Sequence, residues 1–298
     1  MTYHKSVFLH QSIDLLDLQE GGIYVDVTYG GGGHSKEILN RLQNCSLIAF
    51  DQDEDALKNK IPDDRLLLVH SNFSEMEKYL TLYQMFPVDG ILADLGVSSH
   101  QFDDEKRGFS IRANEKLDMR MGKRVKKNAY EVLNTYSKEE LVRVIKNHSD
   151  LITPARIANA IIKKVEEKQM NTTGDLMDAT RYIAEKGKEH KFFAQLFQAI
   201  RMEVNDELDV LKAFLEQSAK VLKPGGKLVV IAYHSIEDRL VKNFMKTGSF
   251  DGEAEKDLFG VSKHNLKMLT KKPLVPDEDE LEENNRSRSA KMRVAVKK

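Results

Sequence analysis

Three acidic side chains stand where apolar runs of the sequence end, and such acids could hold a cationic ligand. Asp26 ends the run GIYVD, Asp51 follows SLIAF, and Asp94 follows GILA. Four glycines, Gly30 to Gly33, come shortly after the first acid. Glycine reaches backbone angles closed to other residues and lets the main chain approach a ligand closely. We interpret these residues as the edge of a ligand crevice.

The glycine run matches no phosphate-binding motif. A P-loop ends in Gly-Lys-Ser/Thr, whereas this run ends Gly-His-Ser, and Ser35 stands where the dinucleotide motif needs its last glycine. A tight turn would use the same glycines. Asp51, roughly 20 residues beyond the run, is suited to the hydroxyls of a ribose. The acids therefore favour a nucleoside with a positive charge, such as S-adenosylmethionine, over NAD with its pyrophosphate.

Alternating strands and helices are expected to position these residues. After the first strand, apolar runs predict strands at 46–50, 65–70 and 88–95, and intervening patterns predict helices at 34–42, 53–58 and 74–83. This alternation predicts an α/β domain with a mostly parallel, doubly wound sheet. The helical spacing of Tyr79, Tyr83 and Phe86 predicts that these rings belong to the core.

The alternation breaks between about Phe109 and Phe197, where only helical patterns occur, at 137–147, 155–168 and 173–187. The α/β pattern then resumes with a helix at 205–222, a strand at 227–233 and a helix at 235–246. Strands at 266–272 and 290–296 predict an antiparallel pair, separated by an acidic segment, 276–284, expected to be a solvated loop. The predicted domains are therefore 1–107 and 197–298, forming the α/β domain, and an all-helical insertion, 108–196.

Charge is unevenly distributed along the chain, although the net charge is only −1. From Asp104 to Leu196 there are 20 Lys and Arg against 14 Asp and Glu, or +6, which leaves 26 against 33, or −7, elsewhere. The middle third is where a polyanion such as RNA is expected to bind. The candidate contacts lie in one basic run and near the C-terminus: Arg112, Arg120, Lys123, Arg124, Lys126, Lys127, Arg286 and Arg288. A solvated surface is the alternative.

Composition favours a soluble, cytoplasmic globule. Hydrophobic residues make up 41% of the 298 residues, and no stretch is long and apolar enough for a signal peptide or a membrane span. The single cysteine, Cys45, excludes an internal disulfide and a cysteine-rich zinc site, and we expect it to be a buried apolar residue. No metal site is expected.

A set of motifs carries a resemblance to a known family. GIYVDVTYGGGGHS, AFDQDEDA, VDGILADLGVSSHQFD, RGFSIR, LDMRM, FQAIRMEVNDEL, YHSIEDRLVK and NNRSRSAKMR occur in this order. Together they resemble the bacterial 16S ribosomal RNA cytosine N4-methyltransferase family, also called MraW, over about His4 to Arg293. The resemblance implies a Rossmann-like class I methyltransferase fold, S-adenosylmethionine as cofactor, and 16S ribosomal RNA or the small ribosomal subunit as partner. It leaves the oligomeric state open, a homodimer included.

The resemblance also implies site residues. Cofactor contacts carried over by position are Gly32, Gly33, His34, Asp51, Phe73, Asp94 and Gln101, to which the strand-end argument adds Asp26. We predict Asp94 and His234 as catalytic residues, with Asp94 orienting the amine or the cofactor and His234 assisting. A histidine at a strand end can also be merely a capping group.

Other functions remain open from the sequence. A methyltransferase of the same fold could act on another RNA base or on a protein. A scaffold that binds RNA and keeps a residual cofactor pocket is a different class of protein, disfavoured because all three strand-end acids are present. A nucleotide-dependent dehydrogenase is least favoured, because the third glycine of its motif is missing.

Overall fold

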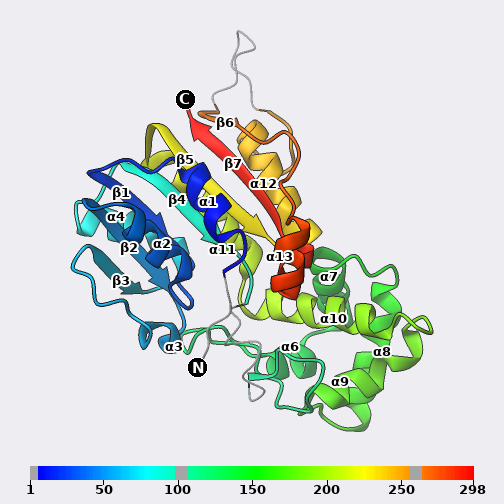
Figure 1. Ribbon diagram of the computed structural model, residues 1–298. Helices are drawn as coiled ribbons and strands as arrows, with labels where there is room; N and C mark the ends of the chain where they lie inside the picture. Colours follow the sequence, from blue (N-terminus) through cyan, green and yellow to red (C-terminus); the bar gives the residue numbers. More distant parts are fainter. Residues whose placement is uncertain (1–5, 98–106, 255–263) are drawn as a thin grey trace. The chain divides into compact units, whose positions relative to one another are not determined.

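The computed structural model describes residues 6–97, 107–254 and 264–298 (Figure 1). Contacts divide the chain into two compact units. The first combines residues 1–96 with 209–298, and the second comprises residues 97–208. The division falls at Gly96 and Asp209, outside the predicted limits of the insertion, so that the helix ending at Val204 belongs to the second unit.

A seven-stranded sheet forms the centre of the first unit, in the order β3-β2-β1-β4-β5-β7-β6. β1 to β5 are parallel, and β7 runs antiparallel to both of its neighbours, β5 and β6. The predicted mostly parallel sheet with an antiparallel C-terminal pair is thereby confirmed. The strands are β1 (Gly22–Asp26), β2 (Cys45–Asp51), β3 (Leu66–His70), β4 (Val88–Asp94), β5 (Leu222–Ala232), β6 (Leu266–Met268) and β7 (Lys291–Lys297).

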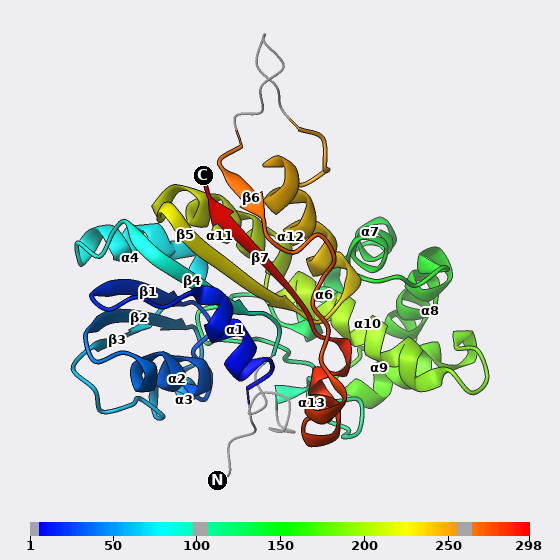
Figure 2. The same cartoon turned by 45° about the horizontal axis from the view of Figure 1, so that its top comes forward.

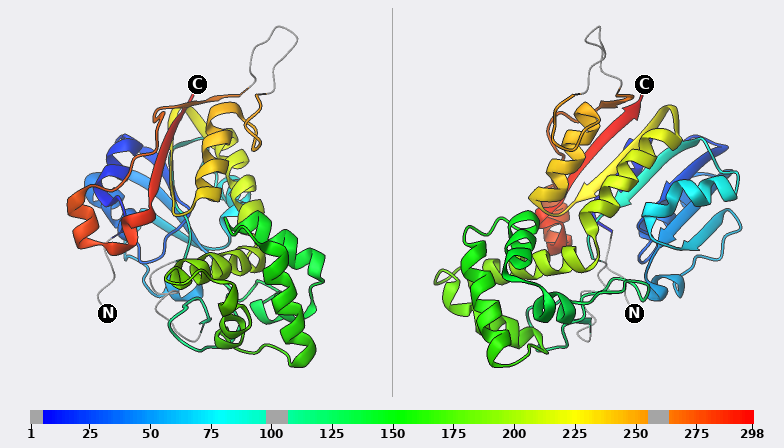
Figure 3. Two further views of the ribbon diagram at one scale, coloured as in Figure 1. Left: turned by 90° about the vertical axis from the view of Figure 1, so that its right-hand side faces the viewer. Right: turned by 180° about the vertical axis from the view of Figure 1, so that it is seen from behind.

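Helices cover both faces of this sheet. On one face lie α1 (Leu9–Leu16) and α2 (Gly33–Arg41); α4 (Met76–Leu82), α11 (Glu207–Val221) and α12 (Ser235–Thr247) lie on the other, as the rear view in Figure 3 shows. Beneath α1 and α2, apolar side chains of helix and sheet share one core, in which Leu16 and Ile38 meet Leu47, Leu92 and Val229. The loop that leaves β1 is therefore anchored on a rigid base.

Short elements complete the first unit. They are α3 (Glu54–Leu57), η1 (Phe73–Glu75), α13 (Glu278–Glu283) and η4 (Asn285–Ser289). Asp53 caps α3, its side chain accepting a hydrogen bond from the backbone N–H of Asp55.

The second unit is helical, with α6 (Ala129–Thr135), α7 (Lys138–His148), α8 (Pro154–Glu167), α9 (Thr173–Thr180), η3 (Arg181–Ile183) and α10 (Glu189–Val204), all labelled in Figure 2 except η3. Its own core joins Leu133, Val144, Ile161 and Ile200. Local signals explain where the helices begin. Ser137 and Glu140 form a capping box at α7, and Pro154 occupies the first turn of α8.

Three sequence predictions were wrong in detail. The acidic segment is not a loop throughout, because Glu278–Glu283 forms α13: Asp277 caps the helix, and acids in the first turn are favourable at a helix N-terminus. α9 ends at Thr180 instead of near 187. Tyr83 and Phe86 lie outside the core, 44% and 55% exposed, because α4 ends at Leu82.

None of the helices within the described ranges has both the length and the apolar character that a bilayer span requires.

Candidate active site

The sheet brings the three predicted acids to one edge. Asp26, Asp51 and Asp94 are the last residues of β1, β2 and β4, and β1 lies between the other two strands. Because these strands are parallel, their carboxyl ends share one edge of the sheet. The crevice at this edge, where neighbouring connections leave in opposite directions, is the usual ligand site of such folds.

Asp26 is fully buried and organises the start of α2. Its carboxylate accepts hydrogen bonds from Ser35 Oγ at 2.7 Å and from the backbone N–H of Thr28 at 3.1 Å. Burial raises the pKa of this carboxyl, and the neighbouring His34 and these hydrogen bonds oppose the rise. Asp26 therefore ties the glycine turn to the end of β1 and adds negative charge beneath it.

Asp51 holds the glycine turn from the neighbouring strand. Its two carboxylate oxygens accept one backbone N–H each, from Gly30 and from Asp53, both at 2.8 Å. Burial raises the pKa of Asp51 to about 6, although these hydrogen bonds lower it. A carboxylate has roughly four acceptor positions, so about two remain for hydroxyl groups of a ligand.

Asp94 is linked to β5 through a residue that the sequence analysis did not select. The hydroxyl of Tyr233 donates to Asp94 Oδ1 at 2.7 Å, and Thr28 Oγ1 accepts from the backbone N–H of Asp94 at 2.7 Å. Burial raises the pKa of Asp94 to about 6 against the opposing effects of His34 and Tyr233. The pKa of Tyr233 is itself raised by burial and by this carboxylate, so its hydroxyl stays a donor.

His234 caps α12. Its Nδ1 accepts from the backbone N–H of Glu237 at 3.4 Å, and its Nε2 lies 3.0 Å from Glu237 Oε1. Glu237 is buried and also accepts the backbone N–H of Tyr233 at 3.1 Å. Both ring nitrogens thus lie beside Glu237, Nδ1 at its backbone N–H and Nε2 near its carboxylate, and this position orients the imidazole at the end of β5. His234 is therefore a capping group, as the sequence analysis allowed. Its catalytic role stays a prediction.

The remaining predicted cofactor residues surround the glycine turn or lie at the end of β3. Gly32 has φ 77° and caps α2; a Cβ there would come within 2.7 Å of the Tyr29 hydroxyl, so glycine is required. His34 is buried, with Nε2 3.1 Å from the backbone oxygen of Val7, and Gly33 begins α2. Phe73 begins η1 and packs edge-on against Phe214 at 5.5 Å. Gln101 lies outside the described residues.

The predicted RNA contacts differ in their exposure to solvent and in the ion pairs that the structure gives them. Lys123, Arg124 and Lys126 are exposed. Arg120 donates two hydrogen bonds of 2.8 Å to the carboxylate of Asp118. Lys127 pairs with Asp206 at 2.9 Å and lies 3.5 Å from Glu203.

The other predicted contacts lie apart from this run. Arg112 is exposed in the second unit. Arg286 and Arg288 belong to η4 of the first unit, where Arg288 is exposed and Arg286 is half-buried.

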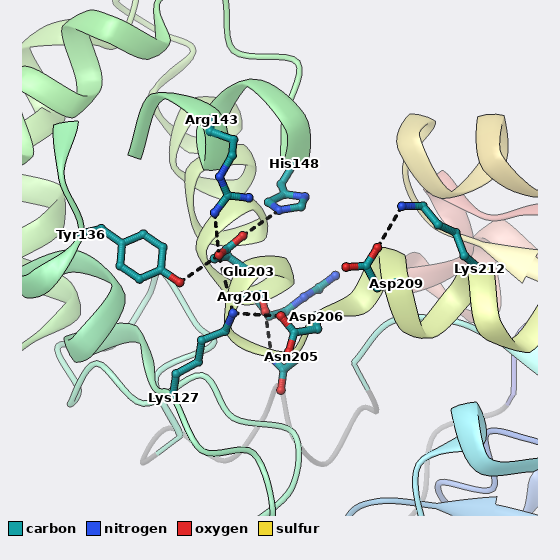
Figure 4. Close-up of polar contacts among 10 residues, drawn as sticks. All are labelled: Lys127, Tyr136, Arg143, His148, Arg201, Glu203, Asn205, Asp206, Asp209 and Lys212. Carbon is teal, nitrogen blue, oxygen red and sulfur yellow. Dashed lines mark hydrogen bonds and ion pairs between the residues drawn. The ribbon is translucent and has the colours of Figure 1, made fainter. Parts of the chain in front are cut away.

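A buried acid in α10 organises the second unit, and sequence reasoning missed it. The carboxylate of Glu203 accepts from Tyr136 Oη at 2.9 Å and Arg143 Nη2 at 3.1 Å, and lies 3.1 Å from His148 Nε2 (Figure 4). These contacts, with Lys127, lower the pKa of Glu203 to about 2 although burial opposes the shift. One feature of the sequence could have indicated it: Glu203 is a single acidic residue between the apolar residues Met202 and Val204.

A parallel sheet in this strand order, with an antiparallel seventh strand, a glycine turn after β1 and acids at three strand ends, is the architecture of Rossmann-like class I methyltransferases. The family model described as the MraW methylase family matches residues 1–298. The chain belongs to this family.

Curated relatives agree with this assignment. Two proteins named Ribosomal RNA small subunit methyltransferase H are similar over the whole chain. The protein of Flavobacterium johnsoniae is 50% identical over 299 residues, 100% of this chain and 98% of the relative. That of Christiangramia forsetii is 49% identical over 301 residues, again 100% and 98%.

Proposed function

We propose that this protein transfers a methyl group from S-adenosylmethionine to the exocyclic N4 amine of a cytidine in small-subunit ribosomal RNA. The observation that carries the proposal is the set of three strand-end carboxylates around the glycine turn, with Asp94 bonded to Tyr233. The names of the relatives, ribosomal RNA small subunit methyltransferase H, support the class of substrate.

The residues present fit such a cofactor. Asp51, whose oxygens each accept a single N–H, would take the ribose hydroxyls, and Phe73 at the end of β3 would lie beside the adenine. Asp26 and Asp94 provide negative charge that would favour the sulfonium and amino groups. When bound, the cofactor supplies a methyl group that is already activated toward nucleophiles.

Asp94 is the residue we assign to the proton of the amine. The amine loses a proton as it gains the methyl group, and a carboxylate with a pKa of about 6 is suited to accept it near neutral pH. The Tyr233 hydroxyl would keep Asp94 in one orientation. His234, oriented by Glu237, would assist from the adjacent end of β5.

Other target atoms are less well supported. Methylation of a pyrimidine at carbon-5 uses a cysteine nucleophile, and Cys45 is buried, with a thiol pKa that burial raises, which is the opposite of activation. Ribose methylation commonly uses a lysine among acids, and no lysine follows β4 before Lys106. Methylation of a nitrogen needs neither a cysteine nucleophile nor a lysine base, so it fits the residues at this edge of the sheet best.

The binding of RNA is assigned to the second unit. Its exposed cations Arg112, Lys123, Arg124 and Lys126 would contact phosphates, and Arg288 of η4 is a further candidate. Lys127 and Arg120 engage carboxylates of their own unit, and we expect them to contribute less than the exposed cations.

A comparison of ribosomal RNA from cells with and without the gene tests the proposal. Nuclease mapping with mass spectrometry should find one N4-methylated cytidine of the small subunit that disappears on deletion. The wild-type gene should restore it, and a gene carrying Asp94→Ala should not. A missing methyl on a ribose oxygen, on cytosine carbon-5 or on a protein would contradict the N4 assignment, and unchanged methylation everywhere would favour the scaffold.

A further inference from the structure

The second unit contains a cavity of about 220 Å³. One wall is a stripe of α10, in which Ala194, Phe197, Gln198 and Arg201 recur at the three- and four-residue spacing of one helix face. Phe109 and Arg112, from the segment that precedes α6, form part of the other wall. All of these residues belong to the second unit.

The charge of the lining favours an anionic or neutral ligand. None of the described residues that line the cavity is acidic. Arg112 is exposed, and within the described ranges no hydrogen bond or ion pair engages its guanidinium. Arg201 donates two hydrogen bonds, of 2.8 and 2.9 Å, to the carboxylate of Glu207, which holds it in place. A cationic cofactor would find no counter-charge here.

The volume of the cavity points to a single ring system as its ligand. Pockets for drug-sized molecules begin at about 300 Å³, so this cavity suits one ring system. Phe109 and Phe197 contribute aromatic surface to it, and unpaired RNA bases are commonly bound by stacking on aromatic side chains.

Gln198 adds a directional group. Its Nε2 donates to the backbone oxygen of His148 at 3.0 Å, and His148 is in turn held by Glu203 (Figure 4). This bond assigns the amide orientation, and the amide oxygen has no hydrogen-bond partner among the described residues. A carbonyl oxygen accepts from an exocyclic amine, which cytosine has and uracil lacks at the same ring position.

We propose that this cavity binds one unpaired, amine-bearing nucleobase of the RNA substrate. The base lies against Phe109 and Phe197, its amine donates to Gln198, and Arg112 contacts the adjoining phosphate. The inference rests on the proposed function and extends it, because it gives the second unit a base-reading site in addition to its phosphate contacts.

Ligand-observed NMR on the full-length protein tests the site with cytidine and uridine monophosphates as probes. Cytidine monophosphate should bind several-fold more tightly than uridine monophosphate, and Gln198→Met should remove that preference. Ala194→Trp should abolish binding of both, because the indole fills the cavity. Lys191→Trp, an exposed position of α10 that does not line the cavity, is the matched control and should change nothing.

Equal affinity for the two nucleotides, or identical behaviour of Ala194→Trp and Lys191→Trp, would overturn the inference. S-adenosylhomocysteine binding, measured by calorimetry on the same variants, should stay within about twofold of wild type. Its loss in Ala194→Trp alone would mean that the cavity belongs to the cofactor. Nucleotide binding that follows these expectations in a protein without N4-methylating activity would leave the base site standing and refute the proposed reaction.

Discussion

Burial gives Asp94 a chemistry that an exposed aspartate does not have. An ordinary aspartate would be too weak a base for a proton leaving an amine near pH 7, whereas the pKa of Asp94 is raised to about 6. Tyr233 moderates this effect, because its hydroxyl donates to the carboxylate and lowers the pKa. Substitution of Asp94 and substitution of Tyr233 should therefore change the kinetics in different ways.

We expect Asp94→Asn to lower kcat by about 10² to 10⁴-fold, because asparagine can still accept from Tyr233 but cannot take a proton. Tyr233→Phe should cost less and should move the acid limb of the pH profile to higher pH, since the pKa of Asp94 rises without its donor. Steady-state kinetics on small-subunit RNA from pH 5 to 8 distinguish the two. An unshifted profile in Tyr233→Phe would contradict the role given to Asp94.

The sequence predicted the site residues that sit at strand ends but not their partners. Asp26, Asp51 and Asp94 could be found because each follows an apolar run, and the sheet does bring them to one edge. Tyr233 reaches Asp94 across 139 positions of the chain, and Glu203 gathers side chains from three other segments. Such contacts depend on tertiary packing, which local spacing does not encode.

At the scale of elements, the basic segment before α6 has cations of two kinds. Arg124 and Lys126 are exposed, whereas Lys127 is half-buried and paired with Asp206 and Glu203. Exposed cations can release counterions from RNA when they bind a phosphate, and an already paired lysine contributes less. The segment is therefore not a uniform charged surface.

A triple variant in which glutamate replaces three exposed cations should bind RNA more weakly and with a flatter dependence on salt. The replaced residues are Lys123, Arg124 and Lys126. The slope of log K against log salt should fall by up to about 2, from roughly 0.7 per single-stranded phosphate contact. Lys146, Lys163 and Lys186→Glu, exposed on or near other helices of the same unit, is the control of equal charge. Equal slopes in both triple variants would mean that the segment is only a solvated surface.

Helices of the second unit meet at Glu203, and we expect Glu203→Gln to destabilise the protein by up to about 3.5 kcal/mol at neutral pH. The figure follows from a pKa lowered from 4.5 to about 2 at about 1.4 kcal/mol per unit. The contribution of a lowered carboxyl pKa is complete above about 4.5 and is lost as the pH falls toward 2. Urea unfolding at pH 7 measures it.

Glu166→Gln, an exposed position of α8, is the control for this loss and should change the free energy of unfolding by less than about 0.5 kcal/mol. If Glu203→Gln were equally harmless, the network in Figure 4 would contribute nothing to stability.

Helices and strands could be predicted where local sequence signals are strong. They were harder to predict where contacts with distant parts of the chain determine the structure. The helical patterns at 137–147 and 155–168 predicted α7 and α8 correctly, and a capping box at Ser137 and Pro154 mark where these helices begin. The segment that forms α13 looked too acidic to be ordered, but a side chain of that helix, Glu280, accepts the backbone N–H of Phe8 at 2.6 Å. A contact across 272 positions of the chain cannot be read from acidic residues alone.

For the molecule as a whole, the acids of the crevice oppose stability when no ligand is bound. The pKa values of Asp51 and Asp94 rise from 3.8 to about 6 on folding, so the folded state holds more protons than the unfolded state between these values. Stability conferred by these groups therefore falls as the pH rises from about 4 to 6. A cationic ligand would relieve this cost, which links cofactor binding to pH.

S-adenosylmethionine should accordingly raise the Tm of the full-length protein more at pH 7.5 than at pH 5. Its affinity depends on ionised carboxylates and should fall by about tenfold or more below pH 6, and ligand stabilisation follows affinity. Asp51→Asn should reduce both the shift and its pH dependence, because it removes one of the ionised carboxylates that the cofactor would face. Differential scanning fluorimetry at saturating and subsaturating cofactor measures these effects. An equal shift at both pH values in wild type, or an unchanged pH dependence in Asp51→Asn, would refute the link between these carboxylates and the cofactor.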